Sequence, residues 1–183
     1  MIPIRFLDQF PVFHLYNRSN DRQTLFSDHR EYMWFIDRVR KYFPPVASIL
    51  GYCIMPNHFH LLLTPKQAIR EEIIRTGKPL SAMPSPEISE AVRRTLMGFT
   101  KKRNYAYDHT GSRFQQRTRC KFHSRGLAHG LEYVHQNPVR AEFVGHPSEW
   151  GYSSYNEYFF RTRPEDCLSD VLLGRRLLTS TAA

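Results

Sequence analysis

Residues 51–65, GYCIMPNHFHLLLTP, constrain the fold more than any other stretch, because two apolar runs flank a short turn signal. Pro56 and Asn57 favour a turn, so the sequence predicts strands over 51–55 and 57–64. Strands joined so closely pair as an antiparallel hairpin, which needs further strands or helices to cover its apolar side chains.

Two histidines interrupt the second of these strands. Side chains alternate between faces along a strand, so His58 and His60 project from the same face, two residues apart. The apolar residues Phe59, Leu61 and Leu63 point to the opposite face and can anchor the strand in a core. A histidine pair with this spacing can reach one metal ion or one phosphate, and two half-buried structural histidines are the alternative.

The other periodic segments complete an order of strand, helix, strand, strand, helix, strand. They are a strand over 10–18, a helix from a Ser27 cap to Pro44, a helix through Ile88, Val92, Leu96 and Phe99 that ends near 101–103, and a strand over 113–122. Residues 66–86 form a long loop with a short helix near 69–75. This order predicts an α+β, ferredoxin-like split βαβ fold with an antiparallel sheet, and places the histidines on the face opposite the two helices.

Charge favours a polyanionic partner. The 183 residues hold 26 Lys and Arg against 17 Asp and Glu, a net charge of +9 with histidines neutral. Nucleic acid is the first partner expected from such a surplus, ahead of a membrane surface. No apolar run approaches the ~18 residues of a membrane span and no signal-peptide pattern is present, so we expect a cytoplasmic protein. Three widely spaced cysteines predict neither a disulfide framework nor a cysteine zinc site.

The predicted strand 113–122 has one cationic face. Its odd positions are all polar: Arg113, Gln115, Arg117, Arg119 and Lys121. Such a strand can lie along a phosphate backbone, and a charged edge strand that resists aggregation is the alternative.

A third helix is predicted over 126–137, where Pro138 ends it. Leu127, Leu131 and Val134 form its buried stripe. Tyr133 and Asn137, four residues apart, share another face. Together with the histidine pair, an amide oxygen can hold Mg²⁺ or Mn²⁺, and a tyrosine oxygen can attack the metal-polarised phosphate to form a phosphotyrosine.

Several motifs resemble a known family, the REP-associated tyrosine transposases, which are relatives of the single-tyrosine His-hydrophobic-His insertion-sequence transposases. These motifs are MPNHFHLLL at 55–63, YVHQNPVRAEFV at 133–144 and WGYSSYNEY at 150–158, with further likeness at 14–26 and 111–122. The resemblance covers about residues 10–160, in the family's order.

The resemblance implies a metal-dependent endonuclease and strand transferase acting on single-stranded DNA. It implies Tyr133 as the nucleophile, His58 and His60 as metal ligands, and imperfect hairpins of the repetitive palindrome type as substrates. Asn137 stands where mobile relatives carry a glutamine ligand, which shortens the side chain by one methylene. The expected DNA-binding residues are Arg18, Lys101, Lys102, Arg103, Arg113, Arg117, Arg119, Lys121 and Arg140.

Other functions stay open at this point. A palindrome-binding regulator without catalysis and an RNA-processing nuclease on the same scaffold are the alternatives. We expect a nucleoid-associated monomer, with a tyrosine-exchanging dimer also possible. Residues 1–163 form the expected catalytic domain, and 164–183 a tail that folds over the DNA or the active site or stays disordered.

Overall fold

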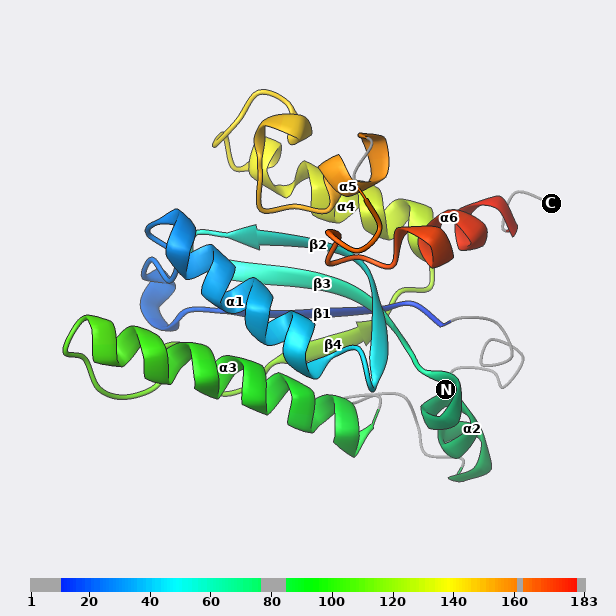
Figure 1. Cartoon of the computed structure of the whole chain (residues 1–183), viewed down its shortest axis with the longest axis horizontal. Helices are drawn as coiled ribbons and strands as arrows, with labels where there is room; N and C mark the ends of the chain where they lie inside the picture. Colours follow the sequence, from blue (N-terminus) through cyan, green and yellow to red (C-terminus); the bar gives the residue numbers. More distant parts are fainter. Residues whose placement is uncertain (1–10, 77–84, 161–162, 181–183) are drawn as a thin grey trace.

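The computed structural model describes residues 11–76, 85–160 and 163–180 (Figure 1). Four strands and two helices form the expected order: β1 (Phe13–Arg18), α1 (His29–Tyr42), β2 (Ala47–Met55), β3 (His58–Pro65), α3 (Pro86–Ala106) and β4 (Arg119–Phe122). The additional helices are α2 (Gln67–Thr76), α4 (Gly126–Arg140), α5 (Tyr155–Phe159) and α6 (Val171–Ser180), with short 3₁₀ turns at Asn20–Arg22 and Pro147–Glu149. Phe10 and residues 77–84, which the sequence assigned to a strand and to a loop, lie outside the described residues.

The sheet confirms the predicted fold class. Its strand order is β2-β3-β1-β4, and every neighbouring pair is antiparallel. Strands β2 and β3 form the predicted hairpin, with Met55 paired to His58 across the turn. Strand β1 lies beside β3 and pairs Arg18 with His58 and Tyr16 with His60. The start of β3 therefore lies next to the end of β1.

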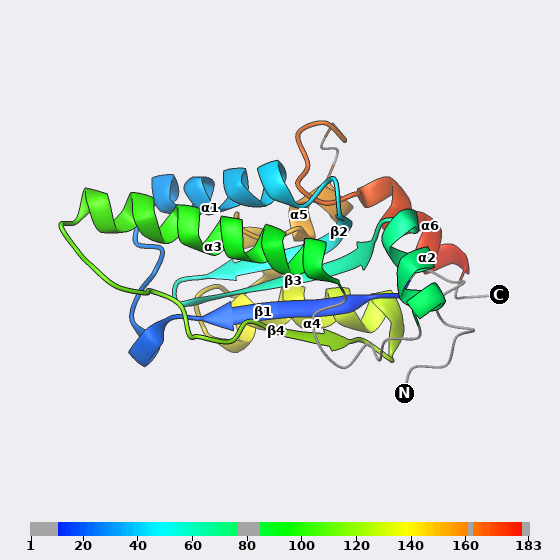
Figure 2. The ribbon, with the colours of Figure 1, turned by 90° about the horizontal axis from the view of Figure 1, so that it is seen from below.

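Helices α1 and α3 pack side by side on one face of the sheet (Figure 2). Their apolar side chains form one core with the inward residues of β1 and β3, among them Leu15, Phe59, Leu61 and Leu63. This is the face that period-two alternation predicted for the apolar residues of β3. Asp28 caps α1 by accepting from the backbone N–H of Glu31, one residue after the expected Ser27 cap.

Helix α4 packs on the opposite face of the sheet, where Leu62 of β3 meets Leu127, Leu131 and Val134, and α6 lies beside β2 (Figure 2). Helix α4 approaches the backbone of β2 closely because Gly51 of β2, which has no side chain, lies beneath it. A Cβ atom at Gly51 would collide with the Leu131 side chain. This close approach holds α4 against the same face as the histidines of β3.

The fourth strand is shorter than predicted. Arg119–Phe122 form the regular ladder with β1, whereas the sequence predicted a strand over 113–122. Pairing resumes only at the other end of the predicted strand, where Phe114 bridges Ser19 and the backbone N–H of Gln115 donates to the carbonyl of Arg18. The preceding segment is held by other bonds, because the Asn17 side-chain amide donates to the Gln115 carbonyl and to Thr118 Oγ1. Phe114 turns into the core and is 3% exposed. The predicted strand is therefore interrupted between Gln115 and Arg119, and both backbone bonds and the Asn17 amide hold the segment before β4 against the end of β1.

Helix α4 also departs from the prediction, since it continues through Pro138 to Arg140. Proline lacks an N–H, so the carbonyl of Val134 loses its usual helical donor. Nδ2 of Asn137 lies 3.5 Å from that carbonyl oxygen and 2.9 Å from the carbonyl oxygen of Tyr133. The Asn137 side chain supplies the donor that the proline removes, which lets the helix run for one more turn.

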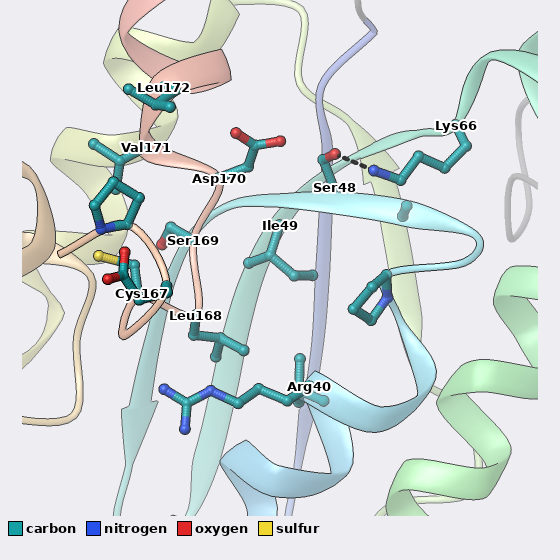
Figure 3. Close-up of a pocket in the computed structure, with 15 residues that line it drawn as sticks. Arg40, Ser48, Ile49, Lys66, Cys167, Leu168, Ser169, Asp170, Val171 and Leu172 are labelled. Carbon is teal, nitrogen blue, oxygen red and sulfur yellow. Dashed lines mark hydrogen bonds between the residues drawn. The ribbon is translucent and has the colours of Figure 1, made fainter.

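The C-terminal segment packs on β2, not over the histidines. The backbone N–H of Asp170 donates to the carbonyl of Ile49 over 2.7 Å, and Val171 joins the core beneath α4. Figure 3 shows a pocket between this segment, α1 and β2. Its volume is about 370 Å³, and Lys66 at its edge donates to Ser48 over 2.8 Å. None of the predicted site residues lines this pocket. Within the part of the chain that the structure describes, every helix is too short or too polar to span a bilayer.

Candidate active site

A pocket of about 430 Å³ opens where the end of β1, the start of β3 and one face of α4 meet. It brings together most of the predicted catalytic residues, although they lie far apart in the sequence. Its walls are formed by Tyr16, Asn17, Arg18, His58, His60, Gln115, Arg117, Arg119, Tyr133 and Asn137.

His58 is held in one protonation form by its neighbour. Its Nδ1 lies 2.6 Å from Oδ1 of Asn57, which can only accept a hydrogen bond. Nδ1 therefore carries the proton, and Nε2 keeps a free lone pair. Burial, and then the positive charge of Arg18, lowers the pKa of His58 to about 4, so the ring is neutral at pH 7.

His60 lies deeper and is 6% exposed. Its ring centroid is 5.0 Å from that of His58, and the two planes are nearly perpendicular. Burial, followed by the charges of His14, His58 and Arg18, lowers the pKa of His60 well below its usual value. Both predicted ligands are therefore neutral imidazoles, which is the form that binds a metal ion.

Tyr133 of α4 lies directly against His60. Its ring meets those of His14 and His60 edge to face, with centroids 5.6 and 5.8 Å away. Tyr133 is 36% exposed, so part of the residue is in contact with solvent. The guanidinium of Arg140, two turns along α4, lies 5.6 Å from the ring centroid.

Asn137 completes the pocket from the next turn of α4. Its amide nitrogen is occupied by the carbonyl of Tyr133, which leaves Oδ1 as the free end of the side chain. This bond to the Tyr133 carbonyl holds the Asn137 amide in one orientation.

The residues present fit a divalent metal ion with a mixed donor set. Two neutral imidazole nitrogens and one amide oxygen are available, and the phosphate of a substrate would supply the negative charge. Among the described residues, no group of three or more His, Cys, Asp or Glu side chains is arranged to hold a metal. A metal here would depend on the amide and on the substrate as well as on the histidines.

Three of the predicted DNA-binding arginines line the pocket, namely Arg18, Arg117 and Arg119. All three are exposed. Lys121 is exposed on β4 opposite His14 and extends this cationic rim along the strand.

Arg113, Lys101 and Lys102 lie outside the pocket. Arg113 donates to Oδ1 of Asn104 over 2.7 Å, and Lys101 lines a separate groove beside α3. Lys102 lies over the ring of Trp34, 4.3 Å from its centroid, on the outer surface of α1 and α3.

Arg103 corrects the sequence prediction. It is 9% exposed, pairs with the fully buried Glu31 over 3.0 Å and donates to the carbonyl of Leu25. Its position in a basic run suggested a DNA contact, but it faces the interior because it lies on the inward side of α3. Arg103 links α3 to α1 and is not a surface cation.

Sequence reasoning missed His14, whose Nε2 lies 2.8 Å from Nδ1 of His60. The alternation of β1 placed His14, Tyr16 and Arg18 on one face, which was the available signal. What the sequence did not show is that β1 lies beside β3, which brings that face to the histidine pair.

One solved structure shares this fold over nearly its whole length. It is a REP-associated tyrosine transposase bound to a REP hairpin, with a TM-score of 0.61 and 20% sequence identity. The alignment covers 88% of this chain and 87% of the other. No protein-family model and no curated protein sequence matches the chain significantly. The comparison establishes a common architecture.

Proposed function

We propose that this protein is a transposase-like endonuclease and strand transferase that cleaves single-stranded hairpin DNA through Tyr133. The observation that carries the proposal is the meeting of Tyr133 with His60 in one open pocket, with ring centroids 5.8 Å apart. The shared fold with a hairpin-bound tyrosine transposase supports it.

The proposed reaction is a transesterification. The Tyr133 oxygen forms a bond to phosphorus and the bond from phosphorus to the 3′ oxygen breaks, which leaves a 5′-phosphotyrosine and a free 3′-hydroxyl. The phenol gives up its proton to solvent through its exposed edge, and the leaving 3′ oxygen takes one up. A second 3′-hydroxyl can reverse the step and join strands, because the ester is retained.

The residues of the pocket have distinct parts in this proposal. His58, His60 and Asn137 would hold Mg²⁺ or Mn²⁺, which supplies charge stabilisation at the scissile phosphate. Arg140 lies over the Tyr133 ring and binds a phosphate beside it. Arg18, Arg117 and Arg119 bind the phosphates on either side and orient the strand across the pocket.

Denaturing gel electrophoresis tests the proposal. The protein is incubated with end-labelled single-stranded DNA that carries an imperfect hairpin and a tetranucleotide at its foot, with Mn²⁺ or with EDTA. We expect a metal-dependent, protein-linked DNA band that disappears in Tyr133→Phe. Tyr155→Phe is the matched control, because Tyr155 lies on α5 outside the pocket.

Other outcomes would contradict the proposal in different ways. Cleavage without a linked band, unchanged in Tyr133→Phe, would point to water as the nucleophile. Tight hairpin binding with no product in any metal would instead favour a palindrome-binding regulator.

A further inference from the structure

Neither the sequence motifs nor the structural comparison assigns a role to His14, which lies beside the pocket. It lies on β1, and its Nε2 is 2.8 Å from Nδ1 of His60. The two rings are stacked with centroids 5.0 Å apart and planes 28° from parallel. The same His14 ring also touches Tyr133 edge to face. His14 therefore contacts both the presumed ligand and the presumed nucleophile.

A hydrogen bond between two imidazoles needs exactly one proton between the two nitrogens. If that proton belongs to His60, its Nδ1 is the donor and its Nε2 keeps a lone pair. If it belongs to His14, a neutral His60 must carry its own proton on Nε2 and cannot bind a metal there. The two arrangements give the same distance between the nitrogens, but only the first leaves Nε2 of His60 able to bind a metal.

We propose that His14 is a positioning residue that accepts the Nδ1 proton of His60 and so keeps Nε2 of His60 open toward the pocket. His58 provides a precedent within the same site, because Oδ1 of Asn57 accepts its Nδ1 proton in the same way. Histidines that bind metals generally donate their second N–H to such a partner, which fixes both the tautomer and the ring orientation.

His14 is not itself placed as a third ligand. Its Nε2 is directed at His60, and the described residues contain no metal-holding group of three histidines.

Two variants separate positioning from packing. Glutamine at position 14 offers a side-chain oxygen acceptor, whereas leucine has a comparable volume and none. In the metal-free protein, long-range ¹H–¹⁵N NMR should show the His60 proton on Nδ1 in the wild type and in His14→Gln. His14→Leu should lose that tautomer preference. His60→Gln assigns the signal.

Metal affinity gives the second measurement, with Mn²⁺ alone as the probe. We expect His14→Leu to bind Mn²⁺ about 10- to 100-fold more weakly than the wild type, and His14→Gln to recover most of that loss. The melting temperature in EDTA reports packing separately, and it should not follow the Mn²⁺ affinity across the three proteins.

A His60 proton on Nε2 in the wild type would overturn the inference, as would a leucine variant that binds Mn²⁺ normally. The wild-type spectrum decides even if His14→Leu does not fold. The inference rests on the proposed function for the ligand role of His60, but the two fail differently. If no tyrosine-linked DNA forms but His60 carries its proton on Nδ1, only the proposed function is contradicted. If linked DNA forms but His60 carries its proton on Nε2, only the inference about His14 is contradicted.

Discussion

The side-chain amide of Asn137 donates to the backbone carbonyl of Tyr133 over 2.9 Å, and this bond ties the presumed ligand to the presumed nucleophile. The same amide nitrogen lies 3.5 Å from the carbonyl oxygen of Val134, which Pro138 leaves without its helical donor. The same bond leaves Oδ1 of Asn137 free at the pocket. One side chain thus extends the helix and presents an oxygen donor.

Asn137 should therefore have two separable effects. Asn137→Ala removes the oxygen donor and the replacement hydrogen bond, so we expect weaker Mn²⁺ binding and a loss of about 1 kcal/mol in the free energy of unfolding. Asn137→Asp keeps a donor oxygen but has no N–H, so it should retain metal binding and still lose stability. Calorimetric Mn²⁺ titration and urea unfolding measure the two effects, with Gln136→Ala as the neighbouring control. Unchanged Mn²⁺ affinity in Asn137→Ala would exclude it as a ligand.

The pair of Arg103 and Glu31 carries a stability prediction. Arg103→Ala leaves the carboxylate of Glu31 buried without its cation, so we expect a loss of about 3–5 kcal/mol. Lys102→Ala, at the adjacent exposed position, should change stability by less than about 0.5 kcal/mol. Urea unfolding followed by circular dichroism measures both. A loss of under about 1 kcal/mol in Arg103→Ala would mean that the pair does not hold α1 and α3 together.

This pair also shows where sequence reasoning stops. Alternation along β1 and β3 and the order of the elements predicted the sheet and the face of His58 and His60, because both patterns are local. The partner of Arg103 could not be predicted, since Glu31 lies on another helix and only tertiary packing joins them. A basic run identifies charge, but it does not show which of its side chains faces inward.

The boundaries that were predicted wrongly have equally specific causes. Pro138 is a sound local signal for the end of a helix, but Asn137 compensates for the missing donor. The strand expected over 113–122 is interrupted between Gln115 and Arg119, where the Asn17 side chain donates to the carbonyl of Gln115 and to Thr118 Oγ1. In each case a side-chain amide donates a hydrogen bond to a backbone carbonyl. Rules based on residue propensity do not account for such bonds.

Stability should fall in mild acid. Burial lowers the pKa of His14, His58 and His135 to about 4, below the value of about 6.5 in an unfolded chain. Between these values the unfolded state binds protons that the folded state does not, so stability is complete above pH 6.5 and decreases toward pH 4. We expect the free energy of unfolding in EDTA to drop by a few kcal/mol between pH 7.5 and 5.

His135 isolates one part of that pH dependence outside the metal site. Its Nε2 lies 2.8 Å from Oγ of Ser154, and a glutamine can replace this bond. His135→Gln should reduce the slope of stability against pH between about 4.5 and 6.5, whatever its stability at pH 7.5. Urea unfolding at four pH values gives the slope. An identical slope in the variant would show that His135 is protonated equally in both states.

The arginines at the pocket should make the affinity for DNA depend on salt concentration. Arg117 and Arg119 line the pocket, whereas Lys102 lies over Trp34 on the other side of the sheet. We expect the double variant Arg117→Ala/Arg119→Ala to bind hairpin DNA more weakly in EDTA. Each phosphate contact to single-stranded DNA contributes about 0.7 to the slope of log affinity against log salt concentration, so the loss of two contacts should reduce the magnitude of that slope by about 1.4. Lys102→Ala should leave the slope unchanged. Fluorescence anisotropy at four salt concentrations measures both, and equal slopes in all three proteins would place the DNA elsewhere on the surface.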